Sequence, residues 1–286
     1  MSKKLSQIQD WALMQELWLN ETNILWASER EKNALFEAVK EKSKQAIMNL
    51  LELPWKSMDE LSEDEINELW LKGSGKDIFV TTDEQDREKW LELRALCHNG
   101  FNTINKIHRA SDWVVTNEKW EIFLAKRSWT KDTYPWYWEI GWGHVDGFDS
   151  YEDTLKREIE EELNLTDNDI LKVTPLSKIL YKDWQQYQFI KVFSVVIKNE
   201  ALISNTDGEI DDKRFFSPEA LLENISQTLA WEPAEIDLIP NQIYCLLLSF
   251  SKREIDVREL LEKYHTWVRE NPSLKDFSIL KVLPTE

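Results

Sequence analysis

The sequence predicts an α+β domain with helical segments on both sides of it. Between residues 101 and 235, polar turns separate short runs of β-branched and aromatic residues, which are typical of strands, and one strong helical pattern lies among them. On both sides of this region, apolar residues recur at helical spacing. We therefore expect a helical segment over 1–100, the α+β domain over 101–235, and a helical extension over 236–286 that packs on the rest.

The first hundred residues are expected to form successive helices. Ser62 with Glu65, and Thr82 with Gln85, have the spacing of capping boxes, in which two side chains satisfy backbone groups at a helix start. The second of these helices would run to Leu96.

Farther along the chain, strand and helix patterns alternate. The strand patterns cover Trp113–Thr116, Glu121–Ala125, Trp136–Ile140, Lys172–Tyr181 and Tyr187–Ile197. The helical patterns cover 150–163, 218–229, 241–250 and 257–269.

The net charge is −18, with 35 Lys and Arg against 53 Asp and Glu. A nucleic-acid groove needs clustered cations, so we expect no nucleic-acid partner. No apolar run reaches the ~20 residues of a membrane span, and the N-terminus lacks the apolar core of a signal peptide. Cys97 and Cys245 are too few for a disulfide framework and are expected to be buried free thiols. These features predict a cytoplasmic protein with no membrane partner.

Fifteen tryptophans are many for 286 residues. Large aromatic side chains mostly fill cores, but they also form platforms on which a ligand stacks. The same two interpretations apply to Trp136, Trp138 and Trp142, which crowd one short segment.

The segment directly after these tryptophans carries the clearest chemical signal. Within a predicted helix, Glu158, Glu161 and Glu162 are spaced so that they project from one face. Such oxygen-rich clusters suit Mg²⁺ or Mn²⁺, although a solvated acidic face has the same spacing. An adjoining apolar face would anchor the helix to the sheet through Leu155, Ile159 and Leu163.

The stretch from Gly143 to Leu165 resembles the Nudix box. That pattern has Gly, five residues, Glu, seven residues, and then Arg-Glu-apolar-any-Glu-Glu-any-Gly-apolar. This chain keeps every spacing, with Gly143, Asp149 and Arg157 at the structural positions. The resemblance implies a Nudix α/β/α sandwich with a mixed sheet, and it covers about residues 104–222.

Two positions depart from the pattern. Asp149 replaces the first Glu and is one methylene shorter, at a position that in the family mainly supports structure near the Arg. Asn164 replaces the final Gly, which follows the helix and is expected to need a positive φ. Asn is the next most tolerant residue there, so we expect both changes to be accepted.

The resemblance also implies a mechanism. Glu158, Glu161 and Glu162 would hold one to three divalent cations against the diphosphate oxygens of a substrate. A Glu would take the proton of the attacking water, and in the family this base is a box Glu, here Glu161 or Glu162, or a Glu of a later loop. Glu209 is the later candidate, with an ordinary loop residue as the alternative.

Upstream residues resemble the Nudix branch that includes isopentenyl diphosphate isomerase. There, the residues at the Arg127 and Lys131 positions grip the diphosphate. His108 and His144 correspond to metal-ligand histidines of the isomerase, or they are structural. The catalytic Cys of the isomerase is missing, because Gly141-Trp142 precede the Gly-His pair.

These observations predict a divalent-metal-dependent hydrolase that cleaves a diphosphate linkage in a small nucleotide-like or other metabolite. Candidate substrate contacts are Arg127, Lys131, Trp138, Trp142 and His144. One alternative is a Nudix-fold binding or regulatory module with weak catalysis, and another is an isomerase-like enzyme. The helical segment before the domain could also form a homodimer interface.

Overall fold

The computed structural model describes residues 78–97, 106–131, 134–183, 186–198, 203, 210–274 and 277–283. The chain divides into two compact units. One unit holds Met1–Arg109, His144–Ser150 and Leu180–Phe189, and the other holds Ala110–Gly143, Tyr151–Ile179 and Ile190–Glu286. Most of the predicted helical segment over 1–100 lies outside the described residues.

In its described part, the first unit begins with a hairpin. Strand β1 (Ile78–Thr82) pairs antiparallel with β2 (Glu88–Leu93), and the short helix α5 (Arg94–Cys97) follows. The helix expected from Thr82 to Leu96 is therefore wrong over most of its length.

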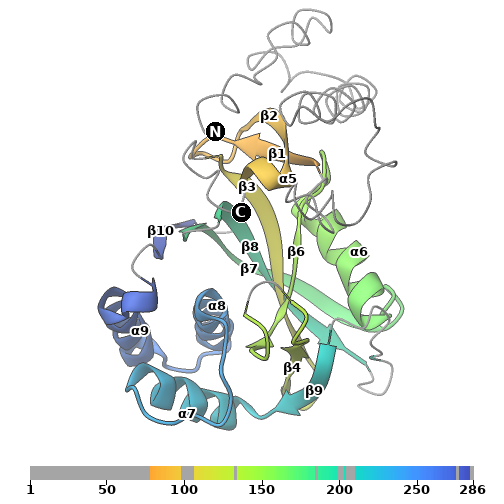
Figure 1. Ribbon diagram of the computed structural model, residues 1–286. Coiled ribbons are helices and arrows are strands. Elements are labelled where there is room, and N and C mark those ends of the chain that lie inside the picture. The colour runs from red at the N-terminus through yellow and green to blue at the C-terminus, as the bar shows by residue number, and fades with distance from the viewer. Residues whose placement is uncertain are drawn as a thin grey trace, which may run out of the picture. The chain divides into compact units, whose positions relative to one another are not determined.

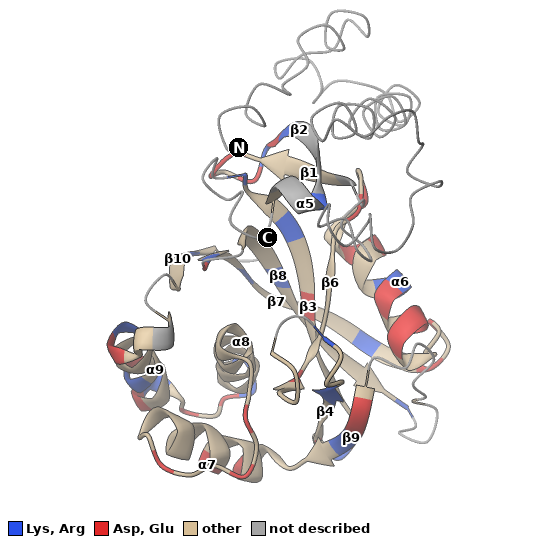
Figure 2. Ribbon diagram, in the orientation of Figure 1, with Lys and Arg blue, Asp and Glu red and all other residues tan. Residues whose placement is uncertain are grey.

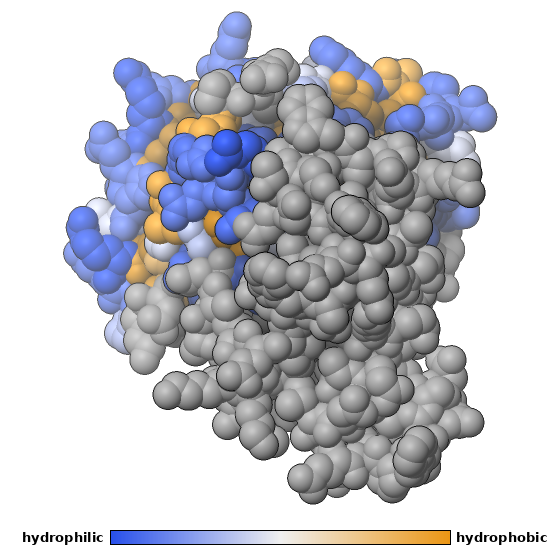
Figure 3. Space-filling model, turned by 90° about the horizontal axis from the view of Figure 1, so that it is seen from above, coloured by the Kyte–Doolittle hydropathy of each residue, from blue (hydrophilic) through white to orange (hydrophobic). Residues whose placement is uncertain are grey.

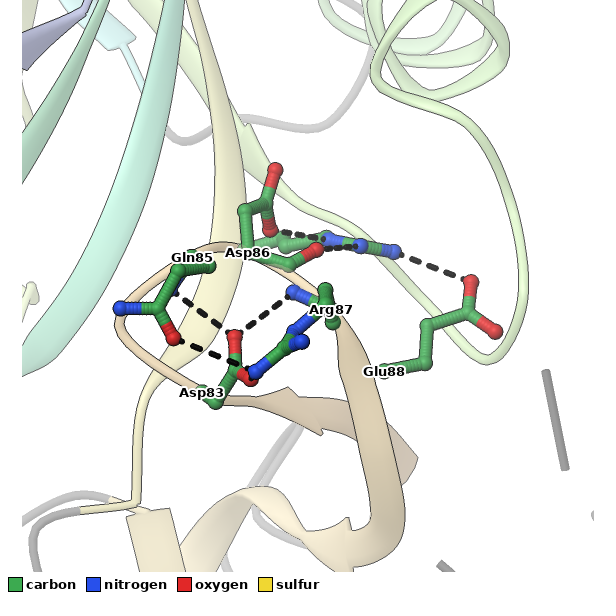
Figure 4. Close-up of polar contacts among 6 residues, drawn as sticks. Asp83, Gln85, Asp86, Arg87 and Glu88 are labelled. Atoms are coloured by element: carbon green, nitrogen blue, oxygen red, sulfur yellow. Dashed lines mark hydrogen bonds and ion pairs between the residues drawn. The ribbon is translucent and has the colours of Figure 1, made fainter. Parts of the chain in front are cut away.

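The turn between β1 and β2 explains this error. The Asp83 carboxylate accepts hydrogen bonds from the backbone amides of Gln85 at 2.9 Å and Arg87 at 3.0 Å (Figure 4). The Arg87 side chain also donates through Nε to Asp83 at 2.7 Å. Asp and Asn carboxyl or amide groups bind backbone amides in turns much as they do at helix starts, so this sequence suits either structure.

Arg109 ties this turn to the start of the next strand. Its Nε donates to the Asp86 carboxylate at 2.8 Å, and its Nη1 donates to Glu88 at 3.2 Å. The three side chains are 6–17% exposed, which places them among the better-shielded ion pairs of the described chain.

A mixed eight-stranded sheet forms the centre of the second unit (Figure 1). Its strands follow the order β10-β7-β8-β3-β4-β5, with β6 paired to β3 and β9 paired to β4. Ends of four of these strands are counted with the first unit. The bounds are β3 (His108–Thr116), β4 (Ile122–Arg127), β5 (Trp138–Glu139), β6 (Gly141–His144), β7 (Ile170–Lys182), β8 (Tyr187–Ile197), β9 (Ile210–Phe216) and β10 (Ser278–Leu283).

Helices lie on both sides of this sheet. In Figure 1, α6 (Tyr151–Leu163) lies to one side, and α7 (Pro218–Leu229), α8 (Pro240–Ser251) and α9 (Arg258–Glu270) lie to the other. A short 3-10 turn, Pro272–Leu274, follows α9. This arrangement confirms the predicted α/β/α sandwich and the helices expected after residue 218.

Local sequence explains where α7 starts. Ser217 is its N-cap, and its hydroxyl accepts a hydrogen bond from the Ala220 amide at 3.2 Å. Pro218 follows at the first helical position, where its fixed φ suits the helix and its missing N–H costs nothing. The same Ser-Pro pair marks this boundary in the sequence.

The described tryptophans differ in their burial, and Trp142 is half-buried. Trp113, Trp138 and Trp267 are buried, as the packing interpretation requires. A second group is more than half exposed: Trp120, Trp129, Trp136 and Trp231. Packing therefore accounts for only part of the tryptophan excess. Cys97 and Cys245 are free and buried, which confirms that prediction.

The surface mixes polar and apolar side chains. On the face shown in Figure 3, groups of apolar atoms lie between hydrophilic ones in the coloured part. Such a mixture is common on protein surfaces exposed to water. In the part of the chain that the structure describes, every helix is too short or too polar to cross a bilayer.

Candidate active site

Helix α6 carries the predicted acidic face. Its buried residues are Tyr151, Thr154, Leu155, Ile159 and Leu163. Most of its other side chains are acidic, and Lys156 and Arg157 lie among them (Figure 2). The apolar face therefore fixes the helix in the second unit, and the glutamates lie outside that face, as the spacing predicts.

Gly143 and Glu158 lie against each other. A Cβ atom at position 143 would stand 2.5 Å from both Cγ and Cδ of Glu158. No side chain at this position is compatible with the observed place of Glu158. This contact between β6 and α6 gives a physical reason for the Gly that opens the box.

Arg157 supplies positive charge within the acidic face. Its Nη1 donates to Glu158 Oε1 at 2.8 Å and lies 3.4 Å from Glu161 Oε2. The Glu158 side chain is 17% exposed, whereas that of Glu161 is 61% exposed. Arg157 offsets part of the repulsion between carboxylates on adjoining turns. The predicted structural role of Arg157 thus has a concrete geometry.

Asn164 ends α6 in the left-handed region, with φ of 55°. The chain turns back there, and the Leu165 amide donates to the Ile159 carbonyl oxygen at 3.4 Å. This confirms the expectation that the position needs a positive φ and that Asn accepts it.

A buried ion pair lies on the strands beside α6. Arg127, at the end of β4, donates through Nη1 to Glu139 Oε2 on β5 at 2.6 Å. The two side chains are 6% and 12% exposed. The Trp142 indole Nε1 donates to the same oxygen at 2.9 Å, and the Arg127 Cζ atom lies 6.0 Å from its ring centre.

The surroundings of Glu139 act on the pKa of its carboxyl in opposite directions. Burial raises the pKa of its carboxyl, while Arg127, Trp142 and Lys131 act in the opposite direction. Sequence reasoning singled out Arg127 and Trp142 but missed Glu139. Because a buried Arg needs a carboxylate partner, the nearby Glu139 was the available signal.

Glu139 and Glu162 line one narrow cleft in the second unit. Its volume is about 20 Å³, which suffices for one water molecule. The remaining lining is largely apolar and includes Phe123, Leu163 and Ile210. The fold therefore brings a box Glu together with a carboxylate that lies outside the box.

The three tryptophans near the box have different surroundings. Trp138 is 3% exposed and packs edge-on against Phe216 at 5.4 Å, with the Arg214 guanidinium 4.7 Å from its ring centre. This burial makes Trp138 part of the core. Trp142 is half-buried, with its indole bonded to Glu139. Trp136 is 54% exposed and has φ of 72°, a conformation that favours glycine.

Three predicted residues, His108, His144 and Asp149, belong to the first unit. His108 and His144 are buried, and each ring stacks on Phe79, at 5.1 Å and 4.8 Å between centroids. Burial lowers the pKa of His108 to about 3, so its imidazole is neutral. Asp149 is exposed, and its amide donates to the Asp146 carbonyl oxygen at 3.1 Å.

The donor chemistry of the box fits a hard divalent cation. Glu158, Glu161 and Glu162 offer carboxylate oxygens from adjoining turns of one helix. Across the described ranges, no three His, Cys, Asp or Glu side chains converge closely enough to form a ready metal site. Arg157 instead contacts two of the glutamates. Glu209 lies outside the described residues.

Comparisons with known proteins bear on the same region. The family model described as NUDIX domain matches residues 106–241. An uncharacterized Nudix hydrolase of Nostoc sp. (strain PCC 7120) is 30% identical over 170 residues, which cover 57% of this chain and 92% of that protein. Another, from Pseudomonas aeruginosa, is 28% identical over 151 residues, which cover 52% and 84%.

An isomerase and a crystal structure are also similar to this chain. Chloroplastic isopentenyl-diphosphate Delta-isomerase I of Arabidopsis thaliana is 25% identical over 181 residues, which cover 56% of this chain and 60% of the isomerase. The crystal structure of a Deinococcus radiodurans protein aligns with a TM-score of 0.44 at 20% identity and covers 55% and 92% of the two chains. The family model falls on the sandwich that carries the box. The Nostoc relative is 30% identical and is covered over 92% of its length, and the chain therefore belongs to the Nudix hydrolase family.

Proposed function

We propose that this protein hydrolyses a diphosphate linkage in a small nucleotide-like or other metabolite, with Mg²⁺ or Mn²⁺ as cofactor. The observation that carries the proposal is the packing of Glu158 against Gly143 and Arg157 on the anchored helix α6. This contact holds one carboxylate of the box in a single place beside two more.

Glu158, Glu161 and Glu162 would hold the cation. When bound, the cation neutralises charge on the phosphates and lowers the pKa of water. The protein contributes the fixed carboxylates, and Glu161, Glu162 or Glu209 would accept the proton of the attacking water. Lys131 and Arg127 would attract the diphosphate. Since Arg127 is buried against Glu139, Lys131 is the more accessible of the two cations.

A substrate panel tests this proposal. Purified protein with Mg²⁺ is expected to release phosphate or a monophosphate from at least one nucleotide sugar, dinucleotide or free nucleotide. Because carboxylates alone cannot neutralise a diphosphate, EDTA is expected to abolish the release and added Mg²⁺ to restore it. Turnover that survives EDTA unchanged would contradict metal-dependent hydrolysis.

One observation favours a second candidate, a Nudix-fold binding module. The described carboxylates do not form a ready metal site, and a protein that mainly binds its ligand does not need one. This candidate predicts that a diphosphate ligand raises the melting temperature without being cleaved. Robust turnover on the panel would exclude binding as the main function.

The similarity to the isomerase favours a third candidate. Against it, Cys97 and Cys245 are both buried, and neither lies in the segment before Gly143. Incubation with isopentenyl diphosphate in deuterated buffer is expected to give no exchange. The homodimer and the cytoplasmic location remain predictions.

A further inference from the structure

The two carboxylate oxygens of Glu139 have different surroundings. Oε2 accepts both hydrogen bonds, from Arg127 at 2.6 Å and from Trp142 at 2.9 Å. No hydrogen-bond donor among the described residues reaches Oε1. One edge of the carboxylate is therefore fixed by two rigid donors, while the other edge has acceptor capacity left.

The cleft beside Glu139 has room for one water molecule. Its volume of about 20 Å³ exceeds the ~10–15 Å³ that a single water occupies, and it is far below the ~300 Å³ of a small-molecule pocket. A buried water needs two or more polar partners, and Glu139 and Glu162 are the two carboxylates of this lining. The other side chains of the lining are apolar and offer it no hydrogen bonds.

We infer that Glu139 is a further catalytic residue, one that orients the attacking water by accepting a hydrogen bond from it, with Glu162 as the second acceptor. The inference rests on the proposed hydrolase function. Arg127 and Trp142 then act as positioning residues, because they hold Oε2 and thereby fix where Oε1 points. Arg127 therefore helps to place the attacking water in addition to supplying positive charge.

The substitution E139Q tests whether Glu139 acts as the hydrogen-bond acceptor of the water. A Gln side chain has one carbonyl oxygen, and both Arg127 and Trp142 require an acceptor. The carbonyl oxygen is expected to stay with these two donors, so the amide NH₂ group faces the cleft. The shape of the side chain is kept, but an acceptor for the water becomes a donor. Because Arg127 also loses the charge of its partner, the kinetics are measured at a temperature at which E139Q is shown to be folded.

The substitution E139Q should slow hydrolysis without weakening metal binding. Misorienting the water is expected to lower kcat about 100-fold while KM stays within about twofold of wild type. Mn²⁺ affinity, measured by titration without substrate, is expected to stay unchanged, because the substitution leaves the three box glutamates intact. The matched control is E160Q, an exposed Glu on α6, which should keep wild-type kcat.

A high-resolution crystal structure of the wild-type protein gives a readout besides activity. It is expected to show one water within hydrogen-bond distance of Glu139 Oε1 and of the Glu162 carboxylate. Absence of that water, or an E139Q variant with wild-type kcat, would overturn the inference. If wild type cleaves nothing on the panel, the proposed function fails. The crystallographic water alone then decides whether Glu139 and Glu162 hold a water between them.

Discussion

Gly143 shows how one residue can decide the geometry of this site. Its missing Cβ leaves the space that the Glu158 side chain occupies, 2.5 Å from where that atom would lie. Glu158 in turn accepts from Arg157 at 2.8 Å. The side chain of one proposed ligand is therefore fixed by a glycine on a strand and an arginine on its own helix.

The substitution G143A should reduce hydrolysis more than stability. The new Cβ must push the Glu158 side chain into another rotamer, so the backbone can stay in place. We expect kcat/KM to fall about 100-fold, with a melting temperature within a few degrees of wild type. In an E158Q background the same change should cost far less, because the two residues act through one contact. Equal losses in both backgrounds would argue against this contact.

At the scale of elements, the pattern of the chain predicted the second unit well. The helix expected at 218–229 coincides with α7, and the strands expected at 172–181 and 187–197 lie within β7 and β8. These elements are long and strongly patterned. Their start and stop signals, such as Ser217-Pro218, are local in sequence.

The strands that were missed lack such signals. Strand β6 is four residues long and contains two glycines, and β9 is mostly exposed, with the sequence IDDKRFF. Strands β1 and β2 were hidden because the Asp83 turn resembles a helix start. Pairing with strands far away in the chain stabilises these segments, and a local pattern does not report it.

The same limit applies to the site. Box spacing placed the glutamates on one face of α6 and predicted the positive φ of Asn164. It could not show that Glu139 on β5 meets Arg127 on β4, since that pair depends on strand register. It also gave no sign that Trp138 points into the core.

The end of α6 offers a test of its own. Asn164 has φ of 55° and an exposed side chain, so its backbone conformation is its main contribution. Because a Cβ without a polar group is unfavourable in this region, N164A should lower the free energy of unfolding by about 1 kcal/mol. N164G should match wild type or exceed it in urea denaturation. An N164A variant as stable as N164G would contradict this explanation.

At the scale of the whole molecule, the acidic residues that give the net charge of −18 lie in different environments. Part of it is the acidic face of α6, where cations would lie between protein and phosphate (Figure 2). Another part is buried in the second unit, where Asp112 is 2% exposed and accepts from the Cys245 thiol at 3.6 Å. Burying that carboxylate affects the stability of the whole protein.

Stability should therefore fall as the pH rises through the range in which Asp112 ionises. Burial, together with the charge of Glu139, raises the pKa of Asp112 to about 7, against 3.8 for its ordinary value. Between these values the folded protein holds a proton that the unfolded chain releases. The free energy of unfolding then decreases by up to about 1.4 kcal/mol per pH unit between pH 4 and 7.

The variant D112N isolates this effect. It cannot ionise, so its stability should change less than that of wild type between pH 5 and pH 8 in urea denaturation. Wild type and D112N are expected to differ most at pH 8, where the buried charge is present only in wild type. If both proteins lose the same stability over this range, another group is responsible.

The most direct test of the account compares hydrolysis by wild type and E161Q on the best substrate of the panel, with Mg²⁺ present. Glu161 is exposed, so the substitution should leave the fold intact while removing one charge from the proposed cation site. E161Q is expected to lose at least about 100-fold in kcat/KM, whereas E160Q is expected to keep the wild-type value. An E161Q variant as active as wild type on every substrate that is turned over would contradict the assignment of the active site to the acidic face of α6.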